Sequence, residues 1–383
     1  MKFNACCFIF PRMIAPIRSY FTIEQTSSLP ARQIHSRHKE DGQAGGRGRH
    51  VSRRVLRTGS PDIRYASVGI SAALRHASCF TFHVSRFITI FLPVLLLAQD
   101  IPVFNSERAF NFLEQQCELG PRNPGSSGHR QGLQFILKTV VPLADSVIQQ
   151  QFIHIDPYSG EMLTLTNVIA QFNPAMKKRI WIAAHWDTRP WADRDRDRKK
   201  RKQPILGAND GASGVAVLLE LAYHLSQIYP NVGVDLVFLD GEDLGKRGDL
   251  RNFFIGSRYI AKNIPTEFPE YCILIDMVGD ADLEIPKEGY SVVQAPHLVN
   301  QLWQEAEDLG LASFQNVVKH TIEDDHVILF EEGGIPAVVI IDFDYPNTTI
   351  NYWHTTEDTP DKCSAESLEI VGTLLLYHIY RIE

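Results

Sequence analysis

The sequence predicts an α/β protein in which helices cover a mostly parallel β-sheet. Apolar runs of strand length alternate with segments of helical periodicity, and the runs between residues 180 and 341 are almost continuously hydrophobic. Such runs are typical of parallel strands that are buried on both faces, in a sandwich of helices and sheet. Several of the runs end directly in acidic or histidine side chains. Ligands of open α/β sheets bind beyond the carboxyl ends of the strands.

The expected elements begin after residue 105. Helical spacing predicts helices over residues 107–117, 131–141, 214–225, 297–309 and 365–382, with another helix closing at 259–263. Apolar or alternating runs predict strands over residues 147–155, 165–172, 180–184, 234–239, 271–277 and 336–341. Gly and Pro indicate loops at 120–126 and 157–160. We therefore expect residues 105–383 to form the catalytic domain.

The first 86 residues differ in charge from the rest of the chain. They carry 14 Lys and Arg against 4 Asp and Glu, a net charge of +10, whereas the remainder carries 24 against 41, a net charge of −17. Residues 1–85 also lack a periodic apolar pattern, which predicts a disordered or mis-annotated extension, with an organellar transit peptide as the alternative. The acidic remainder argues against nucleic acid as a partner.

A short apolar segment follows this extension. Residues 86–99 have the length of a signal-peptide hydrophobic region and are too short for a comfortable membrane span. No methionine lies between Met13 and Met162, so we expect translation to start at a non-Met codon near Val84. The segment predicts a secreted or periplasmic protein without a stable membrane span. An envelope anchor and a buried helix are the alternatives.

The cysteines do not form a disulfide framework. Six are present, none in a CxxC pair, and three of them (Cys117, Cys272 and Cys363) lie in the expected catalytic domain. An odd number leaves at least one free thiol there. Cys272 lies inside an apolar strand, so we expect it to be buried.

The strand predicted over residues 234–239 ends in an acidic tip, where Asp240 and Gly241 lead into Glu242 and Asp243. Two adjacent carboxylates cannot both stay ionised at close range without a positive partner. Because they follow a strand end, where ligands bind, a metal ion is the obvious partner.

Four further polar residues lie at or near the ends of other predicted elements: His185, Asp210, Asp276 and His354. With the acidic tip they supply two imidazoles and four carboxylates, which are ligand types of catalytic zinc. Taken singly, each has a structural explanation as a turn, a helix cap or a satisfied core histidine. Their joint position at one edge of a sheet favours a site.

Seven segments together resemble the co-catalytic zinc aminopeptidase clan, and within it the glutaminyl cyclases, especially the bacterial branch. These segments are 185–193, 207–214, 240–243, 256–259, 276–280, 324–326 and 353–355. The resemblance spans roughly residues 106–382. It implies a three-layer α/β/α sandwich with a mixed, mostly parallel central sheet, as in zinc aminopeptidases.

The resemblance implies a zinc site with one Zn²⁺ per chain. Asp210, Asp243 and His354 would hold this ion. His185 matches the position that completes a second metal site in the aminopeptidases, so the sequence leaves a second ion open.

The resemblance also implies catalytic and substrate-binding roles. Glu242 would be the general base and acid, and Asp276 would share a hydrogen bond or proton with it. Asp324 would belong to the catalytic polar network on the substrate side. The candidates for substrate binding are Trp353, Trp191 and Asp325, although core packing is an equal alternative for Trp191.

These assignments predict a glutaminyl-peptide cyclotransferase. It would convert the N-terminal Gln of peptides or proteins to pyroglutamate and release ammonia, and we expect a monomer. A dizinc aminopeptidase is the main alternative because all its ligand positions are filled. A binding protein with a vestigial site is the third, and it is disfavoured by the intact Glu242.

The sequence departs from the animal cyclases at several positions. Asp243 replaces a longer glutamate, and Ala184 replaces a cysteine, so the animal disulfide is absent. Val339 stands where the animal enzymes have a second active-site histidine, and Asp342 or Asp344 are the candidates to replace it. The charged run at 193–202 is expected to be a solvated loop at the pocket mouth rather than a site for an acidic partner.

Overall fold

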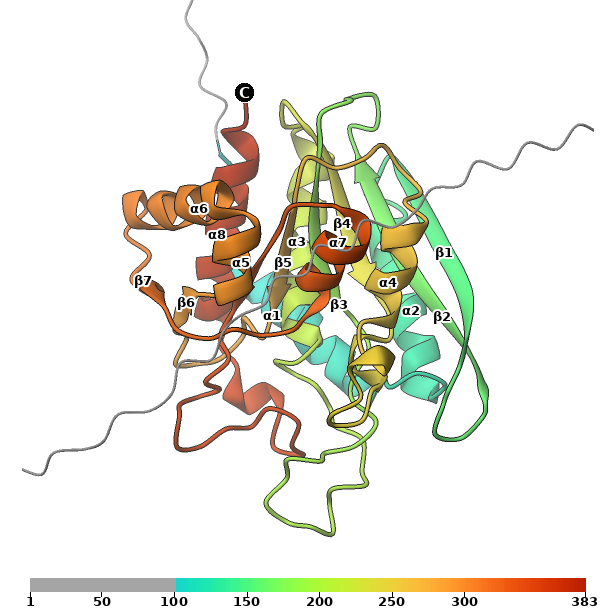
Figure 1. The fold of residues 1–383 in the computed structure, drawn as a ribbon. Coiled ribbons are helices and arrows are strands. Elements are labelled where there is room, and N and C mark those ends of the chain that lie inside the picture. The colour runs from blue at the N-terminus through green and yellow to red at the C-terminus, as the bar shows by residue number, and fades with distance from the viewer. Residues whose placement is uncertain (1–100) are drawn as a thin grey trace, which may run out of the picture. The chain divides into compact units, whose positions relative to one another are not determined.

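A six-stranded β-sheet lies at the centre of the computed structural model, which describes residues 101–383 (Figure 1). The strands are β1 (Ser146–Ile155), β2 (Met162–Phe172), β3 (Arg179–His185), β4 (Gly233–Leu239), β5 (Cys272–Asp276) and β8 (Ala337–Ile341). Their spatial order is β1-β2-β4-β3-β5-β8. The last four strands of this order are parallel, whereas β2 is antiparallel to both of its neighbours. The mixed, mostly parallel sheet is confirmed.

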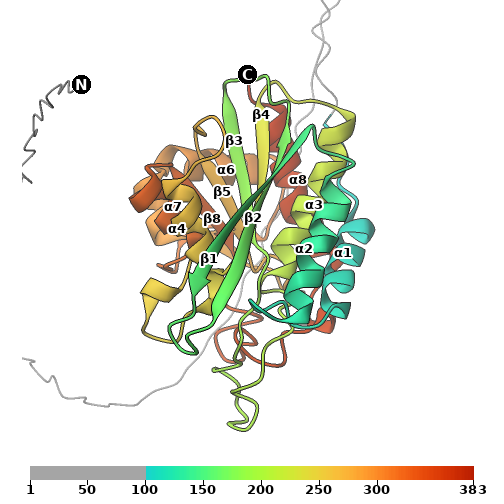
Figure 2. The ribbon, with the colours of Figure 1, turned by 90° about the vertical axis from the view of Figure 1, so that its right-hand side faces the viewer.

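Helices cover both faces of this sheet (Figure 2). One face carries α1 (Ser106–Glu118), α2 (Ser127–Val140), α3 (Ala212–Gln227) and α8 (Ala365–Tyr380), with α6 (Pro296–Asp308) packed against α8. The other face carries α4 (Ile255–Lys262) and α7 (Asp325–Gly333). Side chains of a strand alternate between the two faces. Accordingly, Ile180 and Ile182 of β3 enter one apolar core, and Trp181 and Ala183 enter the other.

Local sequence explains where several helices begin. The side chains of Asn105, Ser126 and Ser364 each accept a hydrogen bond from the backbone N–H three residues on, at the start of α1, α2 and α8. These caps satisfy donors that have no partner inside the helix. Helix α3 is buried along most of its length because α1 and α8 pack on it as well as the sheet.

The sequence did not predict two short strands and two α-helices. These are β6 (Ile285–Lys287) and β7 (Phe314–Val318), which form a separate two-stranded sheet, α5 (Gly289–Gln294), and α7. β6 and α5 are too short to display a period. In α7, Val327, Ile328 and Leu329 are all buried, so no polar face marks the helix. The other strands and α-helices start or end within four residues of the predicted bounds.

Predictions about the cysteines, membrane-spanning helices and the N-terminal segments have different outcomes. Cys117, Cys272 and Cys363 are all buried and unpaired, which confirms the predicted free thiol and the burial of Cys272. Of the helices between residues 101 and 383, none combines the length and hydrophobicity that crossing a bilayer requires. The predicted extension at 1–85 and the signal-like segment at 86–99 lie outside the described residues.

Candidate active site

The predicted site residues meet at the carboxyl edge of the sheet. His185 is the last residue of β3 and Asp276 is the last residue of β5. Asp210 lies in the turn before α3, and Asp243 lies in the 3₁₀ turn η1 (Glu242–Leu244) that follows β4. Parallel strands bring their carboxyl ends to one edge, so residues scattered over the sequence become neighbours.

Asp210, Asp243 and His354 form the first cluster. One possible ligand atom from each lies within 4.8 Å of the other two, and all three residues are buried. The Nε2 atom of His354 is 3.2 Å from Asp243 Oδ1 and 3.5 Å from Asp210 Oδ2. The remaining oxygen of Asp243 and the Oδ2 atom of Asp210 are buried without a hydrogen-bond partner. Buried carboxylate oxygens need a cation or a donor, so this set fits a zinc ion.

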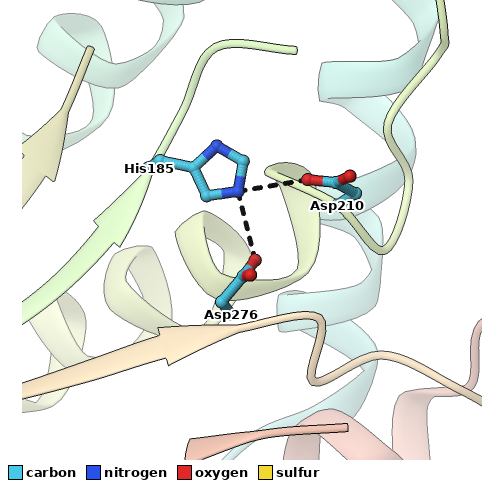
Figure 3. A group of neighbouring side chains, drawn as sticks. All are labelled: His185, Asp210 and Asp276. Carbon is cyan, nitrogen blue, oxygen red and sulfur yellow. Dashed lines mark hydrogen bonds and ion pairs between the residues drawn. The ribbon is translucent and has the colours of Figure 1, made fainter. Parts of the chain in front are cut away.

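His185, Asp210 and Asp276 form a second cluster (Figure 3). The Nε2 atom of His185 lies 3.3 Å from Asp210 Oδ1 and 3.1 Å from Asp276 Oδ1. Asp210 therefore belongs to both clusters, with one oxygen directed to each histidine. The geometry allows a second cation here, a possibility that the sequence also left open.

Buried acids behind the clusters fix their backbone. Asp187 accepts hydrogen bonds from the backbone N–H groups of Glu242, at 2.9 Å, and Asp243, at 3.3 Å. Asp358 accepts from Asn209 N at 2.8 Å and from Asp210 N at 3.2 Å. Sequence analysis gave neither acid a role. Asp187 follows His185 by two residues at a strand end, which is a usable signal, whereas nothing local marks Asp358.

Arg189 is a third residue that the sequence did not assign. Its Nη1 donates to Asp243 Oδ1 at 2.8 Å, and its other nitrogens hold both oxygens of Asp193 at 2.9 Å. Burial acts to raise the pKa of Asp243, but His354 and then Arg189 outweigh it and lower this pKa to about 2. Asp243 is thus held in the ionised form that a metal ligand needs.

Glu242 has the opposite electrostatic environment. Burial, followed by the charge of Asp243, raises its pKa well above the ordinary value for a glutamate. Its side chain lines a pocket together with Asp210, Asp243 and His354. A carboxyl group beside the cation cluster, with a raised pKa and access to the pocket, can hold and return a proton.

The pocket has apolar walls around this polar floor. They are formed by Leu250, Phe253, Phe254, Ile322, Ile341, Phe343 and Trp353. The ring of Trp353 lies 3.9 Å from the His354 ring and 4.7 Å from Phe343, measured between centroids. Trp353 thus lies in the pocket wall beside His354, and its contact with a substrate stays a prediction.

Several candidates lie where the sequence did not place them. Asp276 bonds to His185 rather than to Glu242. Asp324 lines the pocket, but Asp325 does not, and its carboxylate accepts a 2.6 Å hydrogen bond from Ser257. Trp191 also lies outside the lining and packs edge-on against Tyr158.

The two acids that were candidates to replace the second active-site histidine of the animal enzymes, Asp342 and Asp344, do not line the pocket either. Asp342 accepts from Glu284 N, and Asp344 pairs with Lys319 and His320. Neither lines the pocket, because the neighbouring side chains Ile341 and Phe343 point there instead. The charged run at 193–202 is mostly exposed, and its first residues, Asp193 and Arg194, do border the pocket.

An α/β sandwich with two linked His and Asp clusters at one sheet edge defines a protein of the zinc-exopeptidase type. In agreement, the sequence profile of peptidase family M28 matches residues 167–379, more than half of the chain, and the chain belongs to this family. A glutaminyl cyclase from Bacteroides thetaiotaomicron, solved with N-acetylhistamine, is 34% identical with a TM-score of 0.71. The match covers 74% of this chain and 100% of that one.

Two further relatives each cover the same share of this chain. A Zn-dependent exopeptidase from Parabacteroides distasonis is 34% identical, with a TM-score of 0.70 and coverage of 74% and 100%. The glutaminyl-peptide cyclotransferase of the snake Boiga dendrophila is 25% identical over 325 residues, covering 74% of this chain and 84% of its own. The resemblance to bacterial glutaminyl cyclases, drawn from the motifs, is confirmed.

Proposed function

We propose that this chain is a glutaminyl-peptide cyclotransferase that converts the N-terminal Gln of peptides and proteins to pyroglutamate with release of ammonia. The observation that carries the proposal is the position of Glu242, a carboxyl group with a raised pKa that lines the pocket beside Asp210, Asp243 and His354. Identity of 34% over the whole length of a bacterial glutaminyl cyclase supports it.

The residues fit one zinc ion. Asp210, Asp243 and His354 would hold it, and when bound it supplies Lewis-acid polarisation of the substrate γ-carbonyl. Arg189 keeps Asp243 ionised, and Asp187 and Asp358 hold the backbone of the two aspartates in place.

Glu242 would move the proton that the reaction transfers. The α-amine nitrogen of the substrate bonds to its own side-chain amide carbon, the bond from this carbon to the amide nitrogen breaks, and ammonia leaves. Glu242 takes a proton from the attacking amine and gives it to the departing nitrogen. Because amine and amide belong to one residue, the pocket has mainly to orient that residue and to exclude water.

The pocket walls would orient the glutamine. Trp353 supplies an apolar wall beside His354, and Asp324 supplies a polar group in the lining. Burial, followed by the charges of Asp276 and Asp325, raises the pKa of Asp324 well above its usual range. A protonated Asp324 can donate a hydrogen bond to the substrate. Trp191 and Asp325 would not contact the substrate, because neither lines the pocket.

A dizinc aminopeptidase is the second candidate. The cluster of His185, Asp210 and Asp276 favours it, since it could hold another cation. The number of tightly bound zinc ions separates the candidates: we propose one per chain for the cyclase.

Location and assembly are further proposals. The signal-like segment at 86–99 supports a secreted or periplasmic enzyme. We also propose a monomer, which light scattering of the purified protein tests.

Two peptides test the activity directly. One begins with Gln and the other with Leu, and they are otherwise identical. We expect ammonia and a cyclised product from the first and no change in the second. Cleavage of the Leu peptide without cyclisation of the Gln peptide would instead establish the aminopeptidase.

A further inference from the structure

Two arginines at the pocket lack acidic partners. Arg194 follows β3 in the charged loop and Arg247 follows η1, and both are exposed residues of the pocket lining. Within residues 101–383, neither makes an ion pair or a side-chain hydrogen bond with a carboxylate. Arg189, in the same lining, pairs with both Asp193 and Asp243. The two exposed guanidinium groups are therefore free to bind an incoming anion.

Packing against Trp353 and a backbone hydrogen bond hold Arg194 in place. Its Cζ atom lies 3.9 Å from the centroid of the Trp353 ring, and its backbone N–H donates to His354 O at 3.2 Å. Stacking on an aromatic face orients the planar guanidinium and leaves its edge available for hydrogen bonds. The cation is thus fixed at the wall that is proposed to contact the substrate.

Both arginines line the same pocket, and their charges act on each other. Partial burial lowers the pKa of the otherwise exposed Arg194, and the charge of Arg247 lowers it further, while Asp193 opposes them. Two like charges that repel across an opening form a favourable place for a carboxylate, which can accept hydrogen bonds from both.

The acids nearby do not neutralise this pair. Asp193 is engaged through both oxygens by Arg189. Asp210 and Asp243 are buried in the cation cluster. Glu323 is the exposed acid of the lining, and it leaves an excess of positive charge among the exposed groups there.

We propose that Arg194 and Arg247 bind a carboxylate that directly follows the N-terminal Gln of the substrate, so that the enzyme prefers acidic peptides. The proposal rests on the cyclase function, in which the Gln occupies the pocket beside Glu242 and the next residues leave past the mouth. The carboxylate belongs to an acidic side chain at the second position, or to the C-terminus of a dipeptide.

Peptide series measure this preference. Gln-Glu-Phe-amide, Gln-Ala-Phe-amide and Gln-Lys-Phe-amide vary the side chain, whereas Gln-Ala with a free or an amidated C-terminus varies the terminal carboxylate. At low ionic strength we expect kcat/KM for the Glu peptide to exceed that for the Lys peptide about fivefold, because exposed charge pairs are individually weak. The ratio should decline as salt screens the charges.

Charge-reversed variants assign the preference to these residues. Arg247→Glu alone, and combined with Arg194→Glu, should lower the Glu-to-Lys ratio, and the double variant should bring it below one. Arg198→Glu is the matched control, because it lies on the same loop, is exposed and is absent from the lining. It changes the net charge by as much as Arg247→Glu alone and should leave the ratio at the wild-type value. Circular dichroism checks that each variant is folded.

The outcomes separate this proposal from the cyclase function. If Gln-Ala-Phe-amide is not cyclised, the proposed function fails. If it is cyclised but the ratios for side chain and terminus are both one, or neither responds to the double variant, the carboxylate site is wrong. A preference confined to Gln-Ala with a free C-terminus, lost in the double variant, assigns the site to the terminal carboxylate.

Discussion

The two ends of strands β3 and β4 both bury acidic side chains, but the two sets of acids differ in their hydrogen-bond partners. At the amino end, Asp235 of β4 accepts from Arg179 Nε and from Trp181 Nε1, each at 3.1 Å, and its other oxygen pairs with Arg179 Nη2. Gln171 adds a donor at 3.2 Å. Every oxygen has a partner within the protein, as a structural buried charge requires.

At the carboxyl end, the acids exceed the donors that the protein supplies. Asp210 and Asp243 each retain a buried oxygen without a hydrogen-bond partner, although both aspartates are nearly inaccessible. Their backbone is held by Asp358 and Asp187, which add negative charge. Burial of an acid therefore does not by itself mark a site. What marks it is an incomplete set of partners converging on one point.

The largest expected effect is on catalysis. Glu242→Gln removes the proton carrier but keeps the shape of the side chain, so we expect kcat/KM for a Gln peptide to fall about 10³-fold. Zinc content, measured by atomic absorption, should stay at the wild-type value because Glu242 is not in either cation cluster. Glu369→Gln, an exposed position on α8, is the control. Full activity of the Glu242 variant would refute its role.

The next effect is on metal affinity and tests the carboxyl end directly. Asp210→Asn removes a charge shared by both clusters, and we expect zinc affinity to fall more than about 100-fold, exceeding typical effects of residues that only support ligands. Asp187→Asn should lower it by about 10-fold or more through the backbone of Asp243. Titration against a fluorescent chelator measures both. Equal affinity in the Asp210 variant and the wild type would exclude this cluster.

The amino end should respond in stability instead. Asp235→Ala leaves Arg179 buried without its partner, and breaking such a pair costs about 3–5 kcal/mol of unfolding free energy. Zinc affinity of the folded fraction should not change. Urea denaturation of the zinc-loaded protein provides the measurement. A loss of zinc binding at unchanged stability would mean that the amino end also supports metal binding, so that the roles of the two ends are not separate.

The sequence predicted the sheet and its acidic edge because both follow from local patterns. Apolar runs define β3, β4, β5 and β8, and the residues that end them must share an edge. Contacts that join distant segments have no such signal. Asp358 reaches back to Asn209 and Asp210 across the site, and Arg189 selects Asp243 over other acids only once the loops are folded.

The misplaced candidates have the same cause. Trp191 and Asp325 belong to segments that adjoin the pocket, so the sequence could bring them near it. Their direction depends on Tyr158 and Ser257, which are distant in the chain. The sequence also did not predict α7. Its N-cap residue Asp324 lines the pocket, whereas its first residue Asp325 accepts a hydrogen bond from Ser257.

The smallest effect concerns Asp342, a buried acid at the carboxyl edge that belongs to neither class. It accepts from the backbone N–H groups of Glu284 and Asp344 and has no cation partner. Burial raises its pKa to about 7, and Asp280 adds to this.

Because this pKa is raised by folding, the contribution of Asp342 to stability is complete below the unfolded pKa of about 4 and is lost as pH rises through about 7. The wild type should lose up to about 1.4 kcal/mol per pH unit in this window from Asp342 alone, and Asp342→Asn should remove that slope. Urea denaturation between pH 4 and pH 8 measures it, with the exposed Asp308→Asn as control. An unchanged slope would mean that Asp342 is ionised in the fold, and that backbone donors alone can then stabilise a buried carboxylate at this edge.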